Sequence, residues 1–381
     1  MTGIDTPMQR IATTDDLSAQ ALAQYDAIID VRSPAEFAED HLPGAINLPV
    51  LDDDERARVG THYTQVSVFE ARRMGAALTA RNIAAHIDTV LADREKSFRP
   101  LVYCWRGGMR SQSMATILAA VGWKTTLVAG GYRTWRRQVS AALEDDAPMP
   151  VILIDGQTGS AKTRLLHLLA ERGEQVIDLE GLACHRGSIF GDFADMPQPS
   201  QKAFETALWA QLRTLDPDRP VYVEAESRQV GRLRVPPRIW AAMQSAPRIS
   251  IQAPASARAR YLMTAYPDLP RDTEKLMAAI EGLRRFHPKA DIEAWQALAE
   301  SGDFEPLAAA LITAHYDPAY DRARKRDKPA RKPVVLETLD LDAASLIALA
   351  DRVIETGQPD RTIRPAGPRA RQAGPARPGG R

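Results

Sequence analysis

The sequence predicts an α/β protein built from two parallel-sheet domains in succession, and two observations carry this prediction. Short apolar runs alternate with stretches of helical periodicity, as at 27–32, 100–104 and 151–155. Such alternation is typical of parallel strands joined by helices. Two of the runs also lead through a glycine-containing loop straight into a helix, at 104–111 and 156–163. Because functional loops of parallel sheets lie at the carboxyl ends of strands, each domain is expected to carry one site.

The domain boundaries follow from composition along the chain. The stretch at 144–150 is acidic and contains prolines, as a linker does, which predicts a first domain over 1–145. A second domain over 146–355 is expected to hold the loop at 156–163 and to have a helical C-terminal part. The remainder, 356–381, is rich in Pro, Gly, Ala and Arg and is predicted to be a disordered basic tail.

Composition narrows the class of protein. The 381 residues hold 49 basic and 49 acidic side chains, but six arginines and no acid lie in 361–381, so the rest of the chain is acidic overall. A nucleic-acid partner would therefore be held by local basic surface. Two cysteines exclude a disulfide framework and fit a reducing compartment. No apolar run has the length of a membrane span and no signal pattern opens the chain, so we expect a cytoplasmic protein without membrane contact.

Local cues define the elements of the first domain. The run at 27–32 is a strand that ends in a charged pair, and Ser33 followed by Pro34 begins a helix, because serine caps a helix and proline fits its first turn. The other elements expected here are a short strand after the turn at 41–49, a helix over 67–95, a strand over 100–104, a helix from about 110 to Gly122 and a strand over 125–128.

One loop of the first domain combines a cysteine, a glycine pair and two arginines. Cys104 ends a strand, Gly107 and Gly108 form the loop, and Arg106 and Arg110 lie on either side of the glycines. Such a loop points backbone N–H groups inward, and the following helix adds partial positive charge. These surroundings favour the thiolate, so Cys104 is predicted to be a catalytic nucleophile assisted by Arg110. The alternative is a small buried hydrophobe, the commoner state of a free cysteine.

The loop at 156–163 lies between a buried apolar strand and a leucine-rich helix, the context that a phosphate-binding P-loop requires. Lys162 would reach outer phosphate oxygens, and the Thr163 hydroxyl is placed as in P-loops that bind Mg²⁺, which makes Mg²⁺ a candidate ion. Ala161 stands where the motif has glycine, so binding of a nucleotide is left open. The alternative is a chance glycine loop. The phosphate-binding residues predicted here are Gly156, Gly159, Ser160, Lys162 and Thr163.

Two further segments of the second domain carry polar side chains suited to an anionic ligand. Glu224 ends a buried strand and is a candidate acid or ligand of a metal-bound water, with an exposed strand-end charge as the alternative; Arg228 follows it. His185 and Arg186 lie in a glycine-punctuated loop and suit a diphosphate or an RNA backbone. Cys184 is expected to be a bystander, and no structural metal centre is predicted, because two cysteines alone cannot form a zinc site.

The C-terminal third, from about 255, has helical periodicity, with amphipathic segments at 274–285 and 291–299. Aromatic residues at 315–320 precede a basic run at 322–328. Aromatic rings beside basic side chains suit stacking on RNA bases together with phosphate contacts. A solvated helix end is the alternative.

The first domain resembles a rhodanese domain with Cys104 at its active position. The resemblance rests on the segments 30–37, 41–47 and 130–135. Asp30 and Glu36 are expected to cap helices and brace loops rather than to catalyse. The expected fold is therefore a rhodanese-like parallel-sheet domain followed by a P-loop NTPase-like α/β domain with a helical C-terminal part.

The fusion of these two domains in this order is more specific than either domain alone. With it, the chain closely resembles the bacterial tRNA 2-selenouridine synthases over about 15–350. The segments that carry this likeness are 104–111, 178–183, 185–188, 198–201 and 224–228.

This resemblance implies two reactions on 2-thiouridine at the wobble position of tRNAs for Lys, Glu and Gln. Geranyl diphosphate first alkylates the sulfur to give S-geranyl-2-thiouridine. Selenophosphate then replaces the geranylthio group to give 2-selenouridine. No tightly bound cofactor is implied, and selenophosphate synthetase is a candidate partner.

The resemblance also distributes the roles. Cys104 would serve selenation, as a selenium carrier or as an attacking thiolate. Five residues separate Cys104 from Arg110, which leaves room for the phosphoryl oxygens of selenophosphate, with Arg106, Gly107 and Gly108 as further donors. The residues assigned to the diphosphate of geranyl diphosphate are Gly156, Gly159, Ser160, Lys162, Thr163, His185, Arg186 and Arg228.

Three other functions remain open at this point. The spacing Cys-x5-Arg fits a cysteine-dependent phosphatase, although Tyr103 rather than histidine precedes the cysteine. An ATP-dependent RNA thiolation enzyme or an RNA kinase would use the P-loop for a nucleotide. A non-catalytic RNA-binding module would use the basic run at 322–328 and the tail.

Overall fold

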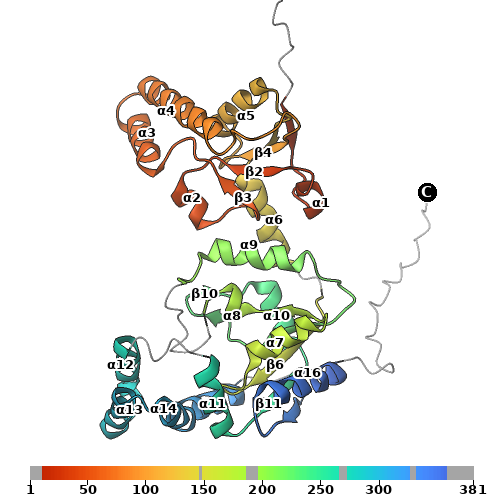
Figure 1. Ribbon diagram of the computed structural model, residues 1–381, viewed down its shortest axis with the longest axis vertical. Helices are drawn as coiled ribbons and strands as arrows, with labels where there is room; N and C mark the ends of the chain where they lie inside the picture. The colour runs from red at the N-terminus through yellow and green to blue at the C-terminus, as the bar shows by residue number, and fades with distance from the viewer. Residues whose placement is uncertain (1–10, 146–147, 186–195, 266–272, 327–331, 358–381) are drawn as a thin grey trace, which may run out of the picture.

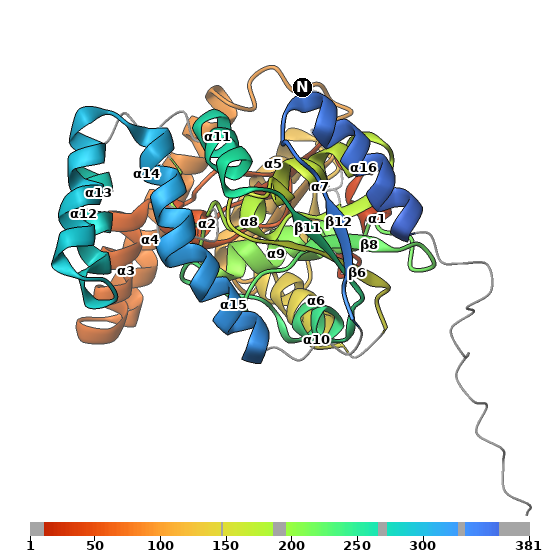
Figure 2. The ribbon, with the colours of Figure 1, turned by 90° about the horizontal axis from the view of Figure 1, so that it is seen from below.

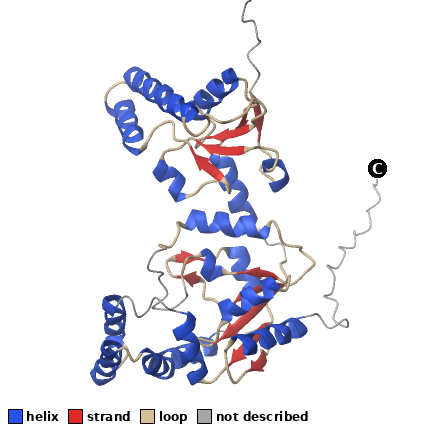
Figure 3. Cartoon of the chain, in the orientation of Figure 1, coloured by secondary structure: helices blue, strands red, loops and turns tan. Residues whose placement is uncertain are grey.

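The computed structural model describes residues 11–145, 148–185, 196–265, 273–326 and 332–357 of the chain. Within these ranges the chain forms two α/β units that lie one above the other along the longest axis of the molecule (Figure 1). Each unit is built on a parallel sheet with helices packed against it (Figure 3). The predicted α/β class is confirmed. The predicted tail lies, except for its first two residues, outside the described residues.

The first sheet has five strands that are all parallel. In spatial order they are β1 (Ala12–Thr14), β5 (Thr126–Val128), β4 (Pro100–Tyr103), β2 (Ala27–Asp30) and β3 (Ala45–Asn47). Because successive side chains of a strand point to opposite faces, Ile29 and Val102 enter one core while Ile28 and Leu101 enter another. Strand β4 is central and ends directly before Cys104.

The helices of this unit follow the local cues where those cues are strong. One helix begins after Ser33 and another ends at Gly122, as predicted. Ser33 and Glu36 form a capping box, and Gly122 is in the left-handed conformation. The helix over 53–65 was not predicted, because none of its side chains is buried and no apolar stripe marks it. The helices are α1 (Ala19–Leu22), α2 (Pro34–Glu39), α3 (Asp53–Gln65), α4 (Val68–Asp88), α5 (Met109–Val121) and α6 (Tyr132–Glu144).

The second sheet is also five-stranded and parallel. In spatial order its strands are β12 (Val334–Glu337), β11 (Arg248–Gln252), β6 (Val151–Gly156), β8 (Val221–Glu224) and β7 (Gln175–Ile177). Helices α7 (Lys162–Glu171) and α16 (Ala343–Gly357) share a core with one face of this sheet. The other face packs on α9 (Gln201–Leu212) and α10 (Pro237–Ser245). The short elements α8 (Leu179–Leu182), β9 (Gln229–Val230) and β10 (Leu233–Arg234) complete this unit.

A single hydrophobic core runs from one unit into the other. It contains Trp135 of α6 together with Phe204 and Leu208 of α9, and α6 lies between the first sheet and α9 (Figure 1). A buried polar chain crosses the same junction: Trp135 Nε1 donates to Thr206 Oγ1 at 3.2 Å, and Thr206 Oγ1 donates to Asp40 at 2.9 Å. The two units therefore form a continuous packed structure.

The C-terminal part is helical up to 326 and then returns to the second sheet. Its helices form a separate small core around Ile280, Ile292 and Trp295, to one side of the sheet (Figure 2). The strand β12, which is an edge strand of the second sheet, was not predicted, because the whole region was interpreted as helical. The elements here are α11 (Ala255–Ala265), α12 (Thr273–Gly282), the 3₁₀ turn Leu283–Arg285, α13 (Lys289–Ser301), α14 (Phe304–Leu311), the π-helical turn Ile312–Tyr316 and α15 (Asp317–Arg326).

Across the described ranges, no helix combines the length and the apolar character needed to cross a membrane.

Candidate active site

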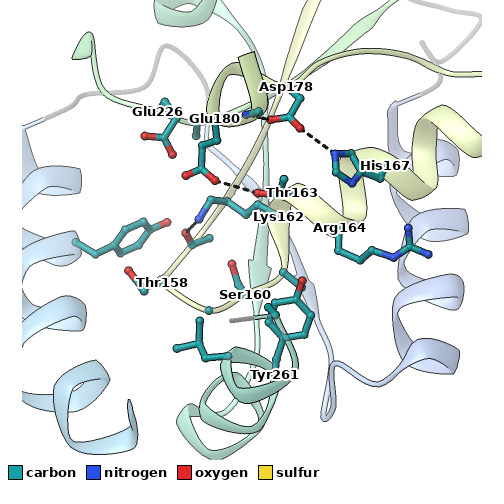
Figure 4. A pocket seen from close by; sticks show the side chains of 18 residues that line it. Thr158, Ser160, Lys162, Thr163, Arg164, His167, Asp178, Glu180, Glu226 and Tyr261 are labelled. Atoms are coloured by element: carbon teal, nitrogen blue, oxygen red, sulfur yellow. Dashed lines mark hydrogen bonds and ion pairs between the residues drawn. The ribbon is translucent and has the colours of Figure 1, made fainter. Parts of the chain in front are cut away.

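The predicted P-loop lies at the carboxyl end of β6 and borders a cavity of ≈ 510 Å³ (Figure 4). The loop supplies the floor of this cavity, and the first turn of α7 supplies Lys162 and Thr163. The buried hydroxyl of Ser160 has no hydrogen-bond partner among the described residues, so a donor or acceptor is left available there. The cavity is lined by Gly156, Thr158, Gly159, Ser160, Ala161, Lys162, Thr163, Arg164, His167, Asp178, Glu180, Gly181, Ala225, Glu226, Tyr261, Leu262, Ala265 and Tyr320.

Ala161 has the backbone conformation that its place in the motif requires. Its φ of 60° and ψ of 28° lie in the left-handed region, where glycine is normally found. Left-handed backbone costs an L-residue roughly 1–2 kcal/mol. The P-loop conformation is therefore kept with alanine at this position, at some cost in stability.

A chain of hydrogen bonds connects the P-loop to the acidic end of β8. Thr163 Oγ1 donates to Glu180 at 3.0 Å (Figure 4), and the backbone N–H of Glu180 donates to Glu224 Oε1 at 2.7 Å. Glu224 is 0% exposed, and burial raises the pKa of its carboxyl well above the usual value, with the charges of Glu180 and Asp178 adding to the shift. Glu224 is not among the cavity-lining residues: its Oε1 holds the backbone of α8, and its buried Oε2 has no hydrogen-bond partner among the described residues.

Glu226 is the acid of this strand end that does line the cavity. Glu226 belongs to the acidic segment 224–228 noted in the sequence, but no role was predicted for it. Burial raises the pKa of the Glu226 carboxyl to about 8, and the charge of Glu180 adds to this while Lys162 opposes it. Lys162 itself donates from Nζ to the carbonyl of Gly156 at 3.1 Å, so its ammonium group lies over the loop.

Two residues of the helical part bind the P-loop and the end of the strand before it. Arg258 of α11 is 3% exposed, donates to the carbonyl of Thr158 at 3.2 Å, and forms a two-pronged ion pair with Asp317 of α15 at 2.8 and 2.7 Å. Tyr320 of α15 donates to Asp155 Oδ1 at 2.8 Å, at the end of β6. Sequence reasoning missed Arg258, because an arginine inside a helical pattern gives no local signal of a loop contact.

Tyr320 belongs to the aromatic segment that was expected to stack on RNA bases, and it lies at the P-loop cavity, which it lines. Burial and the neighbouring Asp155 raise the pKa of its hydroxyl, which donates to Asp155, while the stacking role stays a prediction. Arg324, from the same basic run, donates to the Tyr320 hydroxyl at 3.1 Å. These two residues therefore stabilise the base of the P-loop.

His185 and Arg228, two further residues assigned to the diphosphate, are not among the described residues that line the cavity. His185 lies just after α8, and Arg228 is exposed in the turn after β8. Arg186 lies outside the described residues. Within the described ranges, no group of three or more His, Cys, Asp or Glu is placed to hold a metal ion. The described residues that line the P-loop cavity thus come from the loop, α7, α8 with the preceding Asp178, the segment just after β8, α11 and α15.

The Cys104 loop lies in the other unit, at the carboxyl end of β4. The side chain of Cys104 is buried, and the hydroxyl of Ser111 donates to its Sγ at 3.1 Å. The loop curls tightly around the Gly130-Gly131 turn: a Cβ placed on Gly131 would lie 2.2 Å from the Cys104 carbonyl oxygen and 2.6 Å from the Gly107 nitrogen. Only glycine fits this position, so the turn helps to shape the loop.

The two arginines of the Cys104 loop differ in their surroundings. Arg110 forms an ion pair with Glu36 of α2, with an Nη1–Oε2 distance of 2.5 Å. Burial acts to raise the pKa of the Glu36 carboxyl, but the contact with Arg110 outweighs it and the pKa is lowered. Arg106 is exposed. Gly107 has a φ of 69°, and Gly108 caps α5 at its N-terminus, where N–H groups are available to an anion. Asp30 forms a buried ion pair with Arg32, at 2.6 Å, in the bracing role expected of it.

Comparison with known proteins bears on both sites. A family model described as "Rhodanese-like domain" matches residues 13–138, and one described as "tRNA 2-selenouridine synthase AAA domain" matches residues 149–292. The tRNA 2-selenouridine synthase of Aeromonas salmonicida (strain A449) is 35% identical over 343 residues, which are 82% of this chain and 91% of that relative. The chain belongs to the tRNA 2-selenouridine synthase family.

Two further tRNA 2-selenouridine synthases match over shorter segments. The protein of Chromohalobacter salexigens is 38% identical over 63% of this chain and 65% of its own length. The protein of Nitrosomonas europaea is 36% identical over 64% of this chain and 64% of its own length. The chain thus spans somewhat less than two thirds of these two relatives. The resemblance to tRNA 2-selenouridine synthases noted from the sequence is confirmed.

Proposed function

We propose that this protein modifies the wobble uridine of tRNAs for Lys, Glu and Gln, converting 2-thiouridine to 2-selenouridine through an S-geranyl intermediate. One observation carries the proposal: a P-loop cavity and a strand-end cysteine loop occur together in a chain of the tRNA 2-selenouridine synthase family. Either site alone occurs with many functions. Because the substrate would be tRNA, we expect the protein in the cytoplasm, with selenophosphate synthetase as a candidate partner.

The first step would take place in the P-loop cavity. The thiocarbonyl sulfur of the base attacks C1 of geranyl diphosphate, the bond from C1 to the diphosphate oxygen breaks, and the base loses its N3 proton. Lys162 and the backbone N–H groups of the loop would hold the diphosphate and stabilise the charge that develops on it. Where Mg²⁺ accompanies the diphosphate, the Thr163 hydroxyl and the Glu180 carboxylate would hold it, and it would supply neutralising charge.

The second step would take place at Cys104. The thiolate adds to C2 of the base and expels geranylthiolate, the selenium of selenophosphate then displaces the cysteine, and water cleaves the P–Se bond to give phosphate and 2-selenouridine. This route needs no oxidant, whereas selenium carried on the cysteine sulfur as a perselenide would need one. The Ser111 hydroxyl, 3.1 Å from Sγ, would stabilise the thiolate. The proposed hydrogen-bond donors to the selenophosphate oxygens are Arg106, Gly107, Gly108 and Arg110.

The test is nucleoside mass spectrometry of thiolated tRNA incubated with the full-length protein, geranyl diphosphate and selenophosphate. Wild-type protein should form the geranylated base and then 2-selenouridine. Lys162→Ala should lower geranylation by about 100-fold or more, because a donor to the departing charge is lost. Lys124→Ala, at an exposed lysine of the first unit, is its matched control.

The second half of the same experiment separates the two sites. Cys104→Ser should leave geranylated tRNA to accumulate without selenouridine, while Cys184→Ser, at the other free cysteine, should retain both products. Normal geranylation by Lys162→Ala would overturn the P-loop assignment, and undiminished selenouridine from Cys104→Ser would remove the role of that thiol. An unaltered anticodon base with wild-type protein, together with ATP hydrolysis stimulated by tRNA, would favour an ATP-dependent RNA-modifying enzyme instead.

A further inference from the structure

The P-loop cavity has two chemically different sides. On one side lie Lys162, Thr163 and the acids Glu180 and Glu226, and on the other lies Tyr261 (Figure 4). Tyr261 belongs to the last turns of α11, together with Leu262 and Ala265, and these three are the cavity-lining residues of that helix. Residues three and four apart share a helix face, so Leu262 and Tyr261 both adjoin Ala265 and form one continuous wall.

This wall is held firmly against the P-loop. Arg258, one turn earlier in α11, bonds to the carbonyl of Thr158 and to the carboxylate of Asp317. Leu262 lies so near the loop that a Cβ placed on Gly159 would be 3.2 Å from its Cγ. Helix α11 also packs through Ala259 on Ala308 and Ile312 of the helical part, and Leu262 contacts this cluster as well. The distance between the phosphate-binding loop and the wall is therefore set by rigid elements.

We propose that the α11 wall, formed by Tyr261, Leu262 and Ala265, binds the hydrocarbon chain of a prenyl diphosphate and selects its length. The inference rests on the proposed function, since it assigns the part of the cavity that would receive the geranyl chain. The diphosphate lies on the P-loop, and the chain extends over the wall past Leu262 toward Ala265. A longer side chain at Ala265 shortens the space that is available to the chain.

The chemistry of the wall favours a hydrocarbon over a nucleoside. Leu262 and Ala265 offer no side-chain donor or acceptor, Tyr261 offers a single hydroxyl, and the backbone N–H groups of all three are paired along the helix. A purine edge or a ribose placed there would therefore bury polar groups with few partners. An apolar chain loses nothing at such a surface and gains about fourfold in affinity for each buried CH₂ group.

Binding measured without catalysis tests the wall directly. Calorimetric titration of the full-length protein should show that geranyl diphosphate binds at least about 30-fold more tightly than inorganic diphosphate. Ala265→Phe should remove most of this difference and leave the Kd of inorganic diphosphate unchanged, which also shows that the P-loop is still folded. Thr264→Phe, at the adjacent exposed position outside the cavity, is the matched control and should keep the full difference.

Chain-length selectivity supplies a second readout. Dimethylallyl, geranyl and farnesyl diphosphate are offered to the protein with thiolated tRNA. Ala265→Phe should shift the preference toward dimethylallyl by about 10-fold or more, and Leu262→Ala should shift it toward farnesyl. Wild-type selectivity in both variants, or equal binding of geranyl and inorganic diphosphate by the wild type, would overturn the inference.

Two other outcomes separate this inference from the proposed function. If prenyl chains bind as expected but no base is alkylated, the wall stands and the proposed reaction fails. If ADP binds better than inorganic diphosphate and loses that advantage in Ala265→Phe, the wall receives a nucleoside and the inference is overturned.

Discussion

Two residues at the P-loop depart from their usual behaviour: Ala161 in its backbone conformation and Glu226 in its pKa. Ala161 adopts the left-handed conformation that glycine would adopt without strain. The surrounding loop imposes this conformation, because β6 enters it and α7 leaves it in fixed directions. Alanine therefore occupies the glycine position of the motif in a conformation that glycine favours.

Glu226 gives the cavity a pH dependence. Burial raises the pKa of its carboxyl to about 8, so at pH 7 most molecules carry the neutral acid, which does not repel an anion. As the pH rises through about 8, the carboxylate forms and should weaken diphosphate binding. We predict that, between pH 7 and 9, the Kd of inorganic diphosphate rises about 10-fold more in the wild type than in Glu226→Gln. Calorimetric titration of both proteins measures it.

The raised pKa of Glu226 also makes the free energy of unfolding depend on pH. A carboxyl whose pKa is higher in the folded than in the unfolded protein stabilises the fold fully below the unfolded pKa, near 4.5, and that contribution is lost as the pH rises to about 8. Glu226→Gln should therefore lose less stability over this interval than the wild type. Parallel stability–pH curves for the two proteins would contradict the shift.

Among the secondary-structure elements, α11 and α15 decide how the P-loop is supported. The two helices meet through the ion pair of Arg258 and Asp317, and the guanidinium of Arg258 is almost fully buried. Removing one partner of a buried pair leaves the other charge without compensation, which is strongly destabilising.

We therefore predict that Asp317→Asn lowers the free energy of unfolding by about 3 kcal/mol. Urea denaturation measures this change. Asp321→Asn, at an exposed position on the same helix, should change the free energy by less than about 0.5 kcal/mol. Equal effects of the two substitutions would show that the buried ion pair contributes little.

For the molecule as a whole, the shared core between the two units has a thermodynamic consequence. Trp135 from the first unit and Phe204 from the second belong to one cluster of buried side chains, so the units are expected to unfold together. The helical part has its own core around Ile280 and is coupled to the sheets less directly.

A pair of substitutions tests this coupling by hydrogen exchange. Phe204→Ala leaves a cavity in the shared core, which costs about 3–5 kcal/mol, and should lower amide protection in β4 of the other unit as well as in α9. Ile280→Ala removes a fully buried side chain of the helical core and should lower protection there while β4 keeps its protection. Loss of protection confined to α9 in Phe204→Ala would contradict the coupling.

The sequence allowed most of the first unit and the strand–loop–helix position of both glycine loops to be predicted, because their signals are contiguous. A strand, a glycine loop and a helix follow one another within about a dozen residues at Cys104 and again at Lys162, so neighbouring residues were enough. The helix α3 and the strand β12 escaped prediction because one lacks an apolar stripe and the other is a four-residue run within a region of helical periodicity.

Contacts between distant segments were decided only by the tertiary fold. Tyr320 lies 165 positions from Asp155, and no local pattern shows that its hydroxyl turns inward to the P-loop. Likewise, Glu226 lines the cavity, whereas Glu224 accepts a hydrogen bond from the backbone of α8. Helix α11 lies beside the P-loop because Arg258 binds the carbonyl of Thr158 and the carboxylate of Asp317. Backbone propensity and capping act over a few residues and can be read along the chain, whereas the partner of a buried charge depends on which elements pack together in space.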